Sequence, residues 1–229
     1  MGKNKVIATL PDNIVESLAT TAGVILKEFN PKAFDVTAEG AEAELRSNIL
    51  FATSGGVSVS ASYETVDLAD GIDNAITGLK ELTEIDRWTI EMSGTATTVS
   101  PEAIVSQLGA ADMTTDEVTG LITITPRANL ELSDFKKLWY LCPYGKSDGW
   151  LAVELDNTLS ASFAFQSADK NKGTSGFTYK AYSSAANINK VPITYYIKPS
   201  SDVATTSGTA NTGNGGQTPA QEPENTDGE

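Results

Sequence analysis

The sequence of 229 residues lacks histidine entirely and contains a single cysteine, Cys142. Without histidine the chain has no Ser–His–Asp or Cys–His catalysis, no histidine metal ligand and not the usual general base near neutral pH. One cysteine cannot form a disulfide within the chain, which fits a reducing compartment. Because Cys142 precedes a proline at the end of an apolar run, we interpret it as a buried small hydrophobe. We predict a protein that is not an enzyme and holds no cofactor or metal.

Long apolar runs are also missing. No stretch of roughly 18 apolar residues, the length that indicates a membrane-spanning helix, occurs in the sequence. The first ten residues, MGKNKVIATL, lack the apolar core of a signal peptide. We expect the protein to be made in the cytoplasm, to stay soluble and to have no membrane partner.

Basic residues are scarce, with 16 Lys and Arg against 30 Asp and Glu, and the net charge is -14. Five of the acids and none of the bases follow Lys198, so residues 1–198 carry -9 of this charge. An acidic body does not form the basic patch that nucleic-acid binding requires. Residues 199–229 contain Val203 as their one large apolar residue, and we predict that they form a disordered acidic tail.

The clearest helix signal follows a strand. Apolar and polar residues alternate over 88–93, which is the period of a half-buried strand. Ser100 offers a side-chain oxygen to the free amides of a helix start, and Pro101 suits the first helical position. Gly109 tolerates the left-handed conformation that ends a helix. These signals predict one short flanking helix at about 101–108.

Most of the remaining sequence has strand character. Residues 57–63 alternate strictly between an apolar face and a small polar face formed by Ser58, Ser60 and Ser62. Residues 110–120 read as a polar turn, and Asp156-Asn157 is expected to break a strand. Residues 13–30 allow either an extended arm with a strand at 23–29 or a short amphipathic helix over 12–20. Further strands are expected at 121–125, 139–141, 150–155, 159–165, 177–182 and 191–197.

Residues 64–84 separate two strong strands and are long for a hairpin loop. The segment is too apolar to be simply disordered, so it either folds back on its own core or protrudes and docks on a partner subunit. Three aspartates invite a calcium interpretation, but from Asp70 the third position is Ile72 and the sixth is Ala75, so the EF-hand pattern fails. The candidate contact residues of this loop are Asp70, Ile72, Asp73, Ile76, Leu79 and Leu82.

Six stretches in a fixed order carry a resemblance to a known family. They are 22–31 (AGVILKEFNP), 53–59 (TSGGVSV), 67–79, 88–95 with 100–102, 156–159 (DNTL) and 191–196 (VPITYY). The ordered set resembles the major tail tube proteins of long-tailed, siphovirus-type bacteriophages.

The resemblance implies a mainly β protein with a β-sandwich or barrel-like tail-tube fold over residues 1–198, in which 1–22 is a flexible N-terminal arm and 64–84 is the long loop. Six copies would form a ring, and the rings would stack into the tail tube of the virion, the conduit for DNA ejection. Assembly would take place in the host cytoplasm with tape-measure and tail-completion proteins. DNA would pass through the lumen without specific binding.

The resemblance also implies roles for two sets of residues. The loop residues from Asp70 to Leu82 are candidates for contact between stacked rings, and the face of Ser58, Ser60 and Ser62 is a candidate lining of the lumen or of an interface. Three alternatives stay open: the tube of a contractile injection or type VI secretion system, a tail-completion cap, and a soluble β-sandwich module for adhesion or carbohydrate binding.

Overall fold

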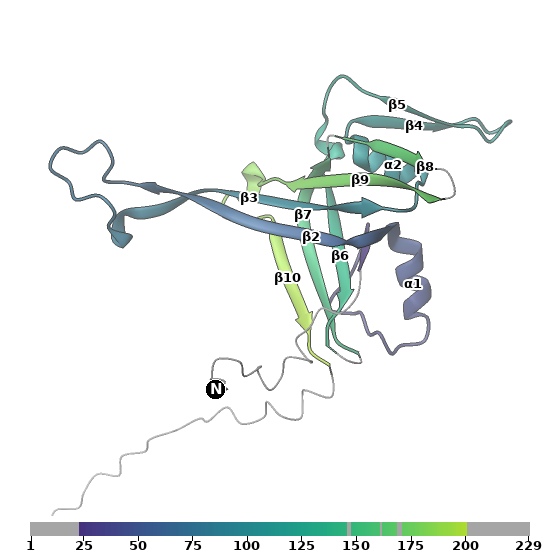
Figure 1. The fold of residues 1–229 in the computed structure, drawn as a ribbon, viewed down its shortest axis with the longest axis horizontal. Helices are drawn as coiled ribbons and strands as arrows, with labels where there is room; N and C mark the ends of the chain where they lie inside the picture. The colour runs from purple at the N-terminus through teal and green to yellow at the C-terminus, as the bar shows by residue number, and fades with distance from the viewer. Residues whose placement is uncertain (1–22, 146–147, 161, 169–170, 201–229) are drawn as a thin grey trace, which may run out of the picture.

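A computed structural model describes residues 23–145, 148–160, 162–168 and 171–200 (Figure 1). The predicted arm 1–22, the alternative helix over 12–20 and the predicted tail from residue 201 onward lie outside these described residues. Ser200, within the predicted tail, is buried, and its hydroxyl donates to Asp148 at 3.1 Å.

The protein is mainly β, as the sequence predicted. The strands are β1 (Val24–Leu26), β2 (Ile49–Asp67), β3 (Thr83–Ala96), β4 (Ala111–Thr115), β5 (Ile122–Pro126), β6 (Lys136–Pro143), β7 (Trp150–Ser160), β8 (Ala164–Ala168), β9 (Asn171–Ala181) and β10 (Ile193–Lys198). The helices are α1 (Ala41–Asn48) and α2 (Pro101–Leu108), with short 3-10 turns at Lys80–Leu82, Leu132–Asp134 and Ala185–Asn187.

The large sheet closes on itself. Its strand order is β10-β7-β6-β1-β2-β3-β9-β8, and an additional pairing joins β7 to β9. Six antiparallel strands, β1, β2, β3, β9, β7 and β6, therefore form a barrel, and β10 and β8 branch from it. A closed sheet has no exposed edge along its ring.

The barrel interior is the main core. Alternate residues of its strands point inward and pack with Ala103 of α2. Phe51 lies against Phe177 with ring centroids 4.9 Å apart. At the helix, the Ser106 and Tyr179 hydroxyls are 2.8 Å apart and Ser175 donates to Gln107 at 2.6 Å. The fully buried residues include Ile25, Phe51, Ile90, Met92, Leu155 and Tyr179.

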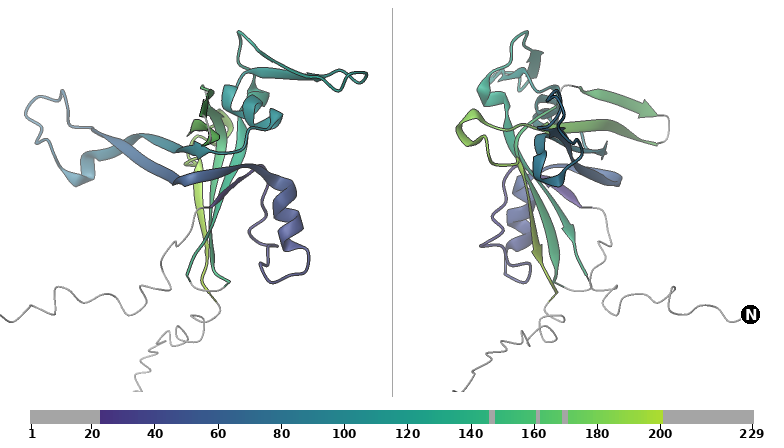
Figure 2. Two further views of the ribbon diagram at one scale, coloured as in Figure 1. Left: turned by 45° about the vertical axis from the view of Figure 1, so that its right-hand side comes forward. Right: turned by 90° about the vertical axis from the view of Figure 1, so that its left-hand side faces the viewer.

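A second apolar cluster lies on the outside of the barrel. The next residues along the same strands, Leu26, Trp139, Leu141, Trp150 and Ala152, point outward and are buried. The segment from residue 27 to 48 covers them, as Figure 2 shows for α1, and its Phe29 ring meets the rings of Trp139 and Trp150 at 5.6 and 5.5 Å. The strands of this wall are therefore apolar on both faces.

The helix α1 corrects the expectation of one helix. Its sequence AEAELRSN consists largely of strong helix formers, and Arg46 pairs with Glu42 one turn away at 2.5 Å. Its only buried residue is Ala41, and Gly40 begins it without a side-chain cap. The sequence has no apolar stripe and no capping residue here, which are the signals that revealed α2.

Asp156-Asn157 does not break a strand, since β7 runs through to Ser160. Asn157 has φ +49° and lies where one edge of β7 changes its partner strand. Up to Leu155 this edge pairs with β10, and from Thr158 onward it pairs with β9. The strand expected at 159–165 is instead divided between the end of β7 and the start of β8. The expected turn at 110–120 contains β4, which pairs with β5 in a separate two-stranded sheet.

Candidate assembly surfaces

The most prominent surface feature is a projecting arm, formed by residues 61–89. Strands β2 and β3 continue their pairing beyond the barrel to Asp67 opposite Thr83, with an irregularity after Glu64. Figures 1 and 2 show this ribbon reaching away from the barrel. Tyr63 and Trp88 pack with ring centroids 5.1 Å apart, and Arg87 pairs with Glu64 at 2.7 Å.

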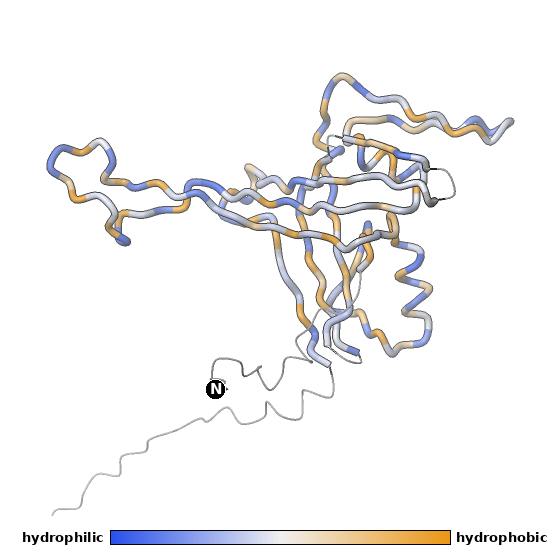
Figure 3. Tube along the Cα trace, viewed as in Figure 1, coloured by the Kyte–Doolittle hydropathy of each residue, from blue (hydrophilic) through white to orange (hydrophobic). Residues whose placement is uncertain are grey.

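The loop at the end of this arm is shorter than the predicted 64–84. Because both strands extend further, the arm loop comprises residues 68–82. It does not fold back on the core: Ile72 and Ile76 are 62% and 72% exposed, and Leu79 is 40% exposed. Along the arm in Figure 3, apolar residues are interspersed with polar ones.

Asp67 organises the arm loop from its base. Its carboxylate accepts hydrogen bonds from the backbone N–H of Gly78 at 2.7 Å and of Ala69 at 2.9 Å. These bonds lower the pKa of Asp67 below its ordinary value. Asp67 is one of the three aspartates that invited the calcium interpretation, and its capping role was not predicted. The available signal was that an Asp side chain often accepts a hydrogen bond from the backbone N–H two residues later in a turn.

The six predicted contact residues all belong to the arm loop. Leu82 is half-buried, and the other five are exposed, namely Asp70, Ile72, Asp73, Ile76 and Leu79. The loop combines apolar side chains with three acids and one lysine. Such an exposed apolar set outside the core is typical of a protein contact.

The predicted polar face of β2 is also exposed. Ser58, Ser60 and Ser62 point away from the core, against which Val57 and Val59 pack. Their cross-strand partners on β3 are Ser93, Glu91 and Thr89, so the polar face continues onto that strand. Lys180 of β9 pairs with Glu91 at 3.0 Å and extends it further. The structure thus brings the serines together on an outward, mostly uncharged face.

Two further surfaces were not anticipated from the sequence. The β4–β5 hairpin stands apart from the barrel, and Val118 near its turn is 94% exposed. Arg127 holds the base of this hairpin through Asp112 at 3.0 Å, Glu131 at 2.8 Å and Asp134. Among the described residues, β10 and β8 are paired on one side only. Sheet edges of this kind accept another strand.

A cavity of about 740 Å³ lies between the end of β1, α2 and β6. We call it the α2 cavity. Its apolar lining comes from Phe29, Leu50, Val105, Met113, Leu138 and Trp139, and its charged lining from Lys27, Glu28, Glu102, Lys136 and Lys137. Lys27 is paired with Glu102 at 2.7 Å. Lys136 makes no ion pair with any of the described residues.

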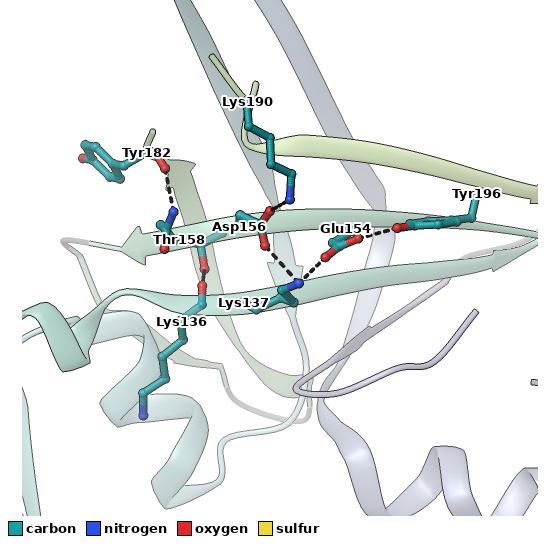
Figure 4. A network of polar contacts seen from close by, with 9 residues as sticks. Lys136, Lys137, Glu154, Asp156, Thr158, Tyr182, Lys190 and Tyr196 are labelled. Carbon is teal, nitrogen blue, oxygen red and sulfur yellow. Dashed lines mark hydrogen bonds and ion pairs between the residues drawn. The ribbon is translucent and has the colours of Figure 1, made fainter. Parts of the chain in front are cut away.

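A network of charges fixes β7 to its neighbours (Figure 4). Lys137 contacts Glu154 and lies 3.0 Å from Asp156, which also binds Lys190 at 2.6 Å, and Tyr196 donates to Glu154 at 2.7 Å. Burial opposes ionisation of Asp156, but hydrogen bonds from the two lysines hold its pKa below the ordinary value. The charges of Lys137, Glu154, Asp156 and Lys190 are all paired, so the network is structural. Lys136 points away from it.

In the part of the chain that the structure describes, no group of His, Cys, Asp and Glu residues is arranged to hold a metal ion. No helix within the described ranges is long and apolar enough to cross a membrane.

No protein-family model and no curated protein matches this sequence. Among solved structures, the chain is similar to one described as "Virion of native gene transfer agent (GTA) particle", with 8% identity, a TM-score of 0.35, and coverage of 71% of this chain and 92% of that chain. The likeness is thus to a component of a virion, and at this TM-score it assigns no role to the present chain.

Proposed function

We propose that this chain is a structural protein of a virion that assembles with copies of itself into stacked rings, forming the tube of a phage-type tail. The observation that carries the proposal is the projecting arm. An isolated two-stranded ribbon is marginally stable in water, and this one ends in exposed isoleucine and leucine side chains. The fold places these side chains where no residue of the same barrel covers them.

The sheet edges support assembly in a second direction. Strand β10 pairs along β7 from Ile193 to Lys198, and its Tyr195 and Ile197 are more than half exposed. A copy placed beside this edge would continue the sheet from one subunit to the next. If the rotation that relates neighbouring copies closes after a whole number of copies, the result is a ring. We propose six copies in each ring, on the resemblance of the sequence stretches to tail tube proteins.

Charge supports a conduit that does not retain DNA. The net charge of -14 makes non-specific binding to phosphates unfavourable. The face of Ser58, Ser60 and Ser62 is small, polar and mostly uncharged, and we propose it as a lining of the lumen or of a subunit interface. Tape-measure and tail-completion proteins are the proposed partners, and the tail of the virion is the proposed location.

The test is negative-stain microscopy with light scattering on the full chain over a series of concentrations. We expect rings or stacked tubes. The double variant Ile72→Asp/Ile76→Asp removes the apolar end of the arm and should abolish stacking. The control is Ile188→Asp, since Ile188 is 76% exposed but lies outside the arm, between the 3-10 turn Ala185–Asn187 and β10, and it should assemble normally.

Two outcomes contradict the proposal. A monodisperse monomer at every concentration, also with a crowding agent that promotes association, excludes a self-assembling tube. Specific binding of that monomer to glycans on an array would instead favour a carbohydrate-binding module.

A further inference from the structure

We propose that the α2 cavity is the receptor for the arm loop of a second copy, so that copies join head to tail through one arm and one cavity. This inference rests on the proposed self-assembly and names the two surfaces that meet along the stacking direction. The occupant is residues 68–82 of the next copy.

The first observation is placement. In Figure 1 the arm projects to the left of the barrel, whereas α1 and α2 lie on its right. The left view of Figure 2, turned by 45°, keeps the arm and the two helices on opposite sides. An arm that reaches the cavity of a neighbour therefore leaves that neighbour's own arm free to continue. A heterologous contact of this kind propagates from copy to copy.

The second observation is chemical complementarity. The arm loop presents Ile72, Ile76 and Leu79 together with three acids and one lysine. The α2 cavity has a lining of six apolar residues, with three lysines against two glutamates. The lining residues themselves therefore carry a net charge of +1, in a protein whose net charge is -14. Like-charged surfaces elsewhere on the chain would repel the acidic loop.

The third observation is the state of the lysines in the cavity. Lys27 is paired with Glu102, and Lys137 is held by Glu154 and Asp156. Lys136 has no ion pair among the described residues, it lines the cavity, and its side chain points away from the network in Figure 4. Its ammonium group is thus available to a carboxylate of the incoming loop, such as Asp70 or Asp73.

The cavity variant Met113→Glu/Lys136→Glu tests the receptor. Met113 is 46% exposed and Lys136 is exposed, so the fold should tolerate both changes. We expect the concentration needed for stacking to rise at least tenfold. The control Lys32→Glu makes the same change of charge as Lys136→Glu at an exposed lysine outside the cavity, and it should stack within twofold of the wild type.

A mixing experiment then identifies the occupant. The cavity variant retains an intact arm, and the arm variant Ile72→Asp/Ile76→Asp retains an intact cavity. Combined with a substitution that blocks the β10 edge, Tyr195→Pro, each variant alone should be a monomer. Their mixture should give a 1:1 dimer, measured by sedimentation velocity, because one intact arm meets one intact cavity.

The outcomes separate this inference from the proposed function. A wild type that never assembles contradicts both. A wild type that stacks while the cavity variant stacks equally well contradicts the receptor alone. If the cavity variant fails to stack but the mixture gives no dimer, the cavity binds another occupant, such as residues 1–22 or a small ligand, and the arm loop is excluded.

Discussion

The packing of α2 against the barrel can be tested with two glycines that both have a positive φ. Gly109 ends α2 with φ +74°, and a Cβ there would lie 2.3 Å from the backbone oxygen of Ser160. Gly120, in the turn of the β4–β5 hairpin, has φ +69°, and a Cβ there would meet nothing within 4 Å. Alanine at either position meets the cost of a positive φ, but at Gly109 it also collides with β7.

The expected losses of stability follow from the cost of the positive φ and, at Gly109, from the collision with β7. A left-handed conformation costs an L-residue about 1–2 kcal/mol, and the stiffer unfolded chain offsets about 0.4–1 kcal/mol of this. Gly120→Ala should therefore lower the free energy of unfolding by about 1 kcal/mol. At Gly109, overpacking adds about 1–3 kcal/mol, which brings the loss to about 2–4 kcal/mol.

Calorimetry and urea unfolding of the full-length variants, under conditions that keep them monomeric, measure the difference. At about 2–4 °C per kcal/mol for a domain of this size, Gly120→Ala should lower Tm by about 3 °C and Gly109→Ala by about 6–12 °C. Equal melting of the two variants would refute a tight contact between the end of α2 and β7. It would also weaken the case for α2 as a fixed wall of the cavity.

Three further predictions concern polar groups. The pKa of Asp156 is lowered in the folded state, so the stability that its ionised carboxylate contributes is complete above the unfolded-state pKa of about 4 and is lost as the pH falls through the folded-state pKa. The difference in unfolding free energy between the wild type and Asp156→Asn should therefore shrink below about pH 4. Urea unfolding over a pH series measures this difference. Tyr179→Phe removes the buried contact with Ser106 and should cost about 0.5–1.5 kcal/mol, and a double-mutant cycle with Ser106→Ala should show coupling, whereas additive effects would contradict the contact. Asp67→Ala should increase amide exchange in the arm loop without changing exchange in the barrel, by hydrogen-exchange mass spectrometry, and unchanged exchange in the loop would contradict its role as the organising residue.

Elements with complete local signals were predictable. The Ser100 hydroxyl accepts from the N–H of Ala103 at 3.1 Å, Pro101 is the first residue of α2, and Gly109 ends it with a positive φ. Each of these interactions spans at most four residues, so the sequence alone defines the helix. The alternation over 57–63 likewise predicted the orientation of Val57 and Val59 toward the core.

Elements that depend on distant partners were not predictable. The arm strands at 64–67 and 83–84 have no buried face, so no apolar alternation marks them in the sequence. They are strands because β2 and β3 continue to pair with each other beyond the barrel. The cavity combines the residues that follow β1 with residues of α2 and β6, and these segments lie far apart in the chain. No local pattern marks Lys136 as the lysine without a partner, because the pairing of its neighbour Lys137 depends on Glu154 and Asp156 of another strand.

The way in which the barrel closes explains why β10 and β8 branch from it. β7 and β9 meet over three residue pairs, from Thr158 opposite Ala181 to Ser160 opposite Tyr179. The rest of the same edge of β7 pairs with β10, and the rest of the same edge of β9 pairs with β8. Asn157, with φ +49°, lies at the point on β7 where these partners change. The short seam thus closes the core, and the remainder of each edge pairs with a branch strand whose outer side is unpaired among the described residues.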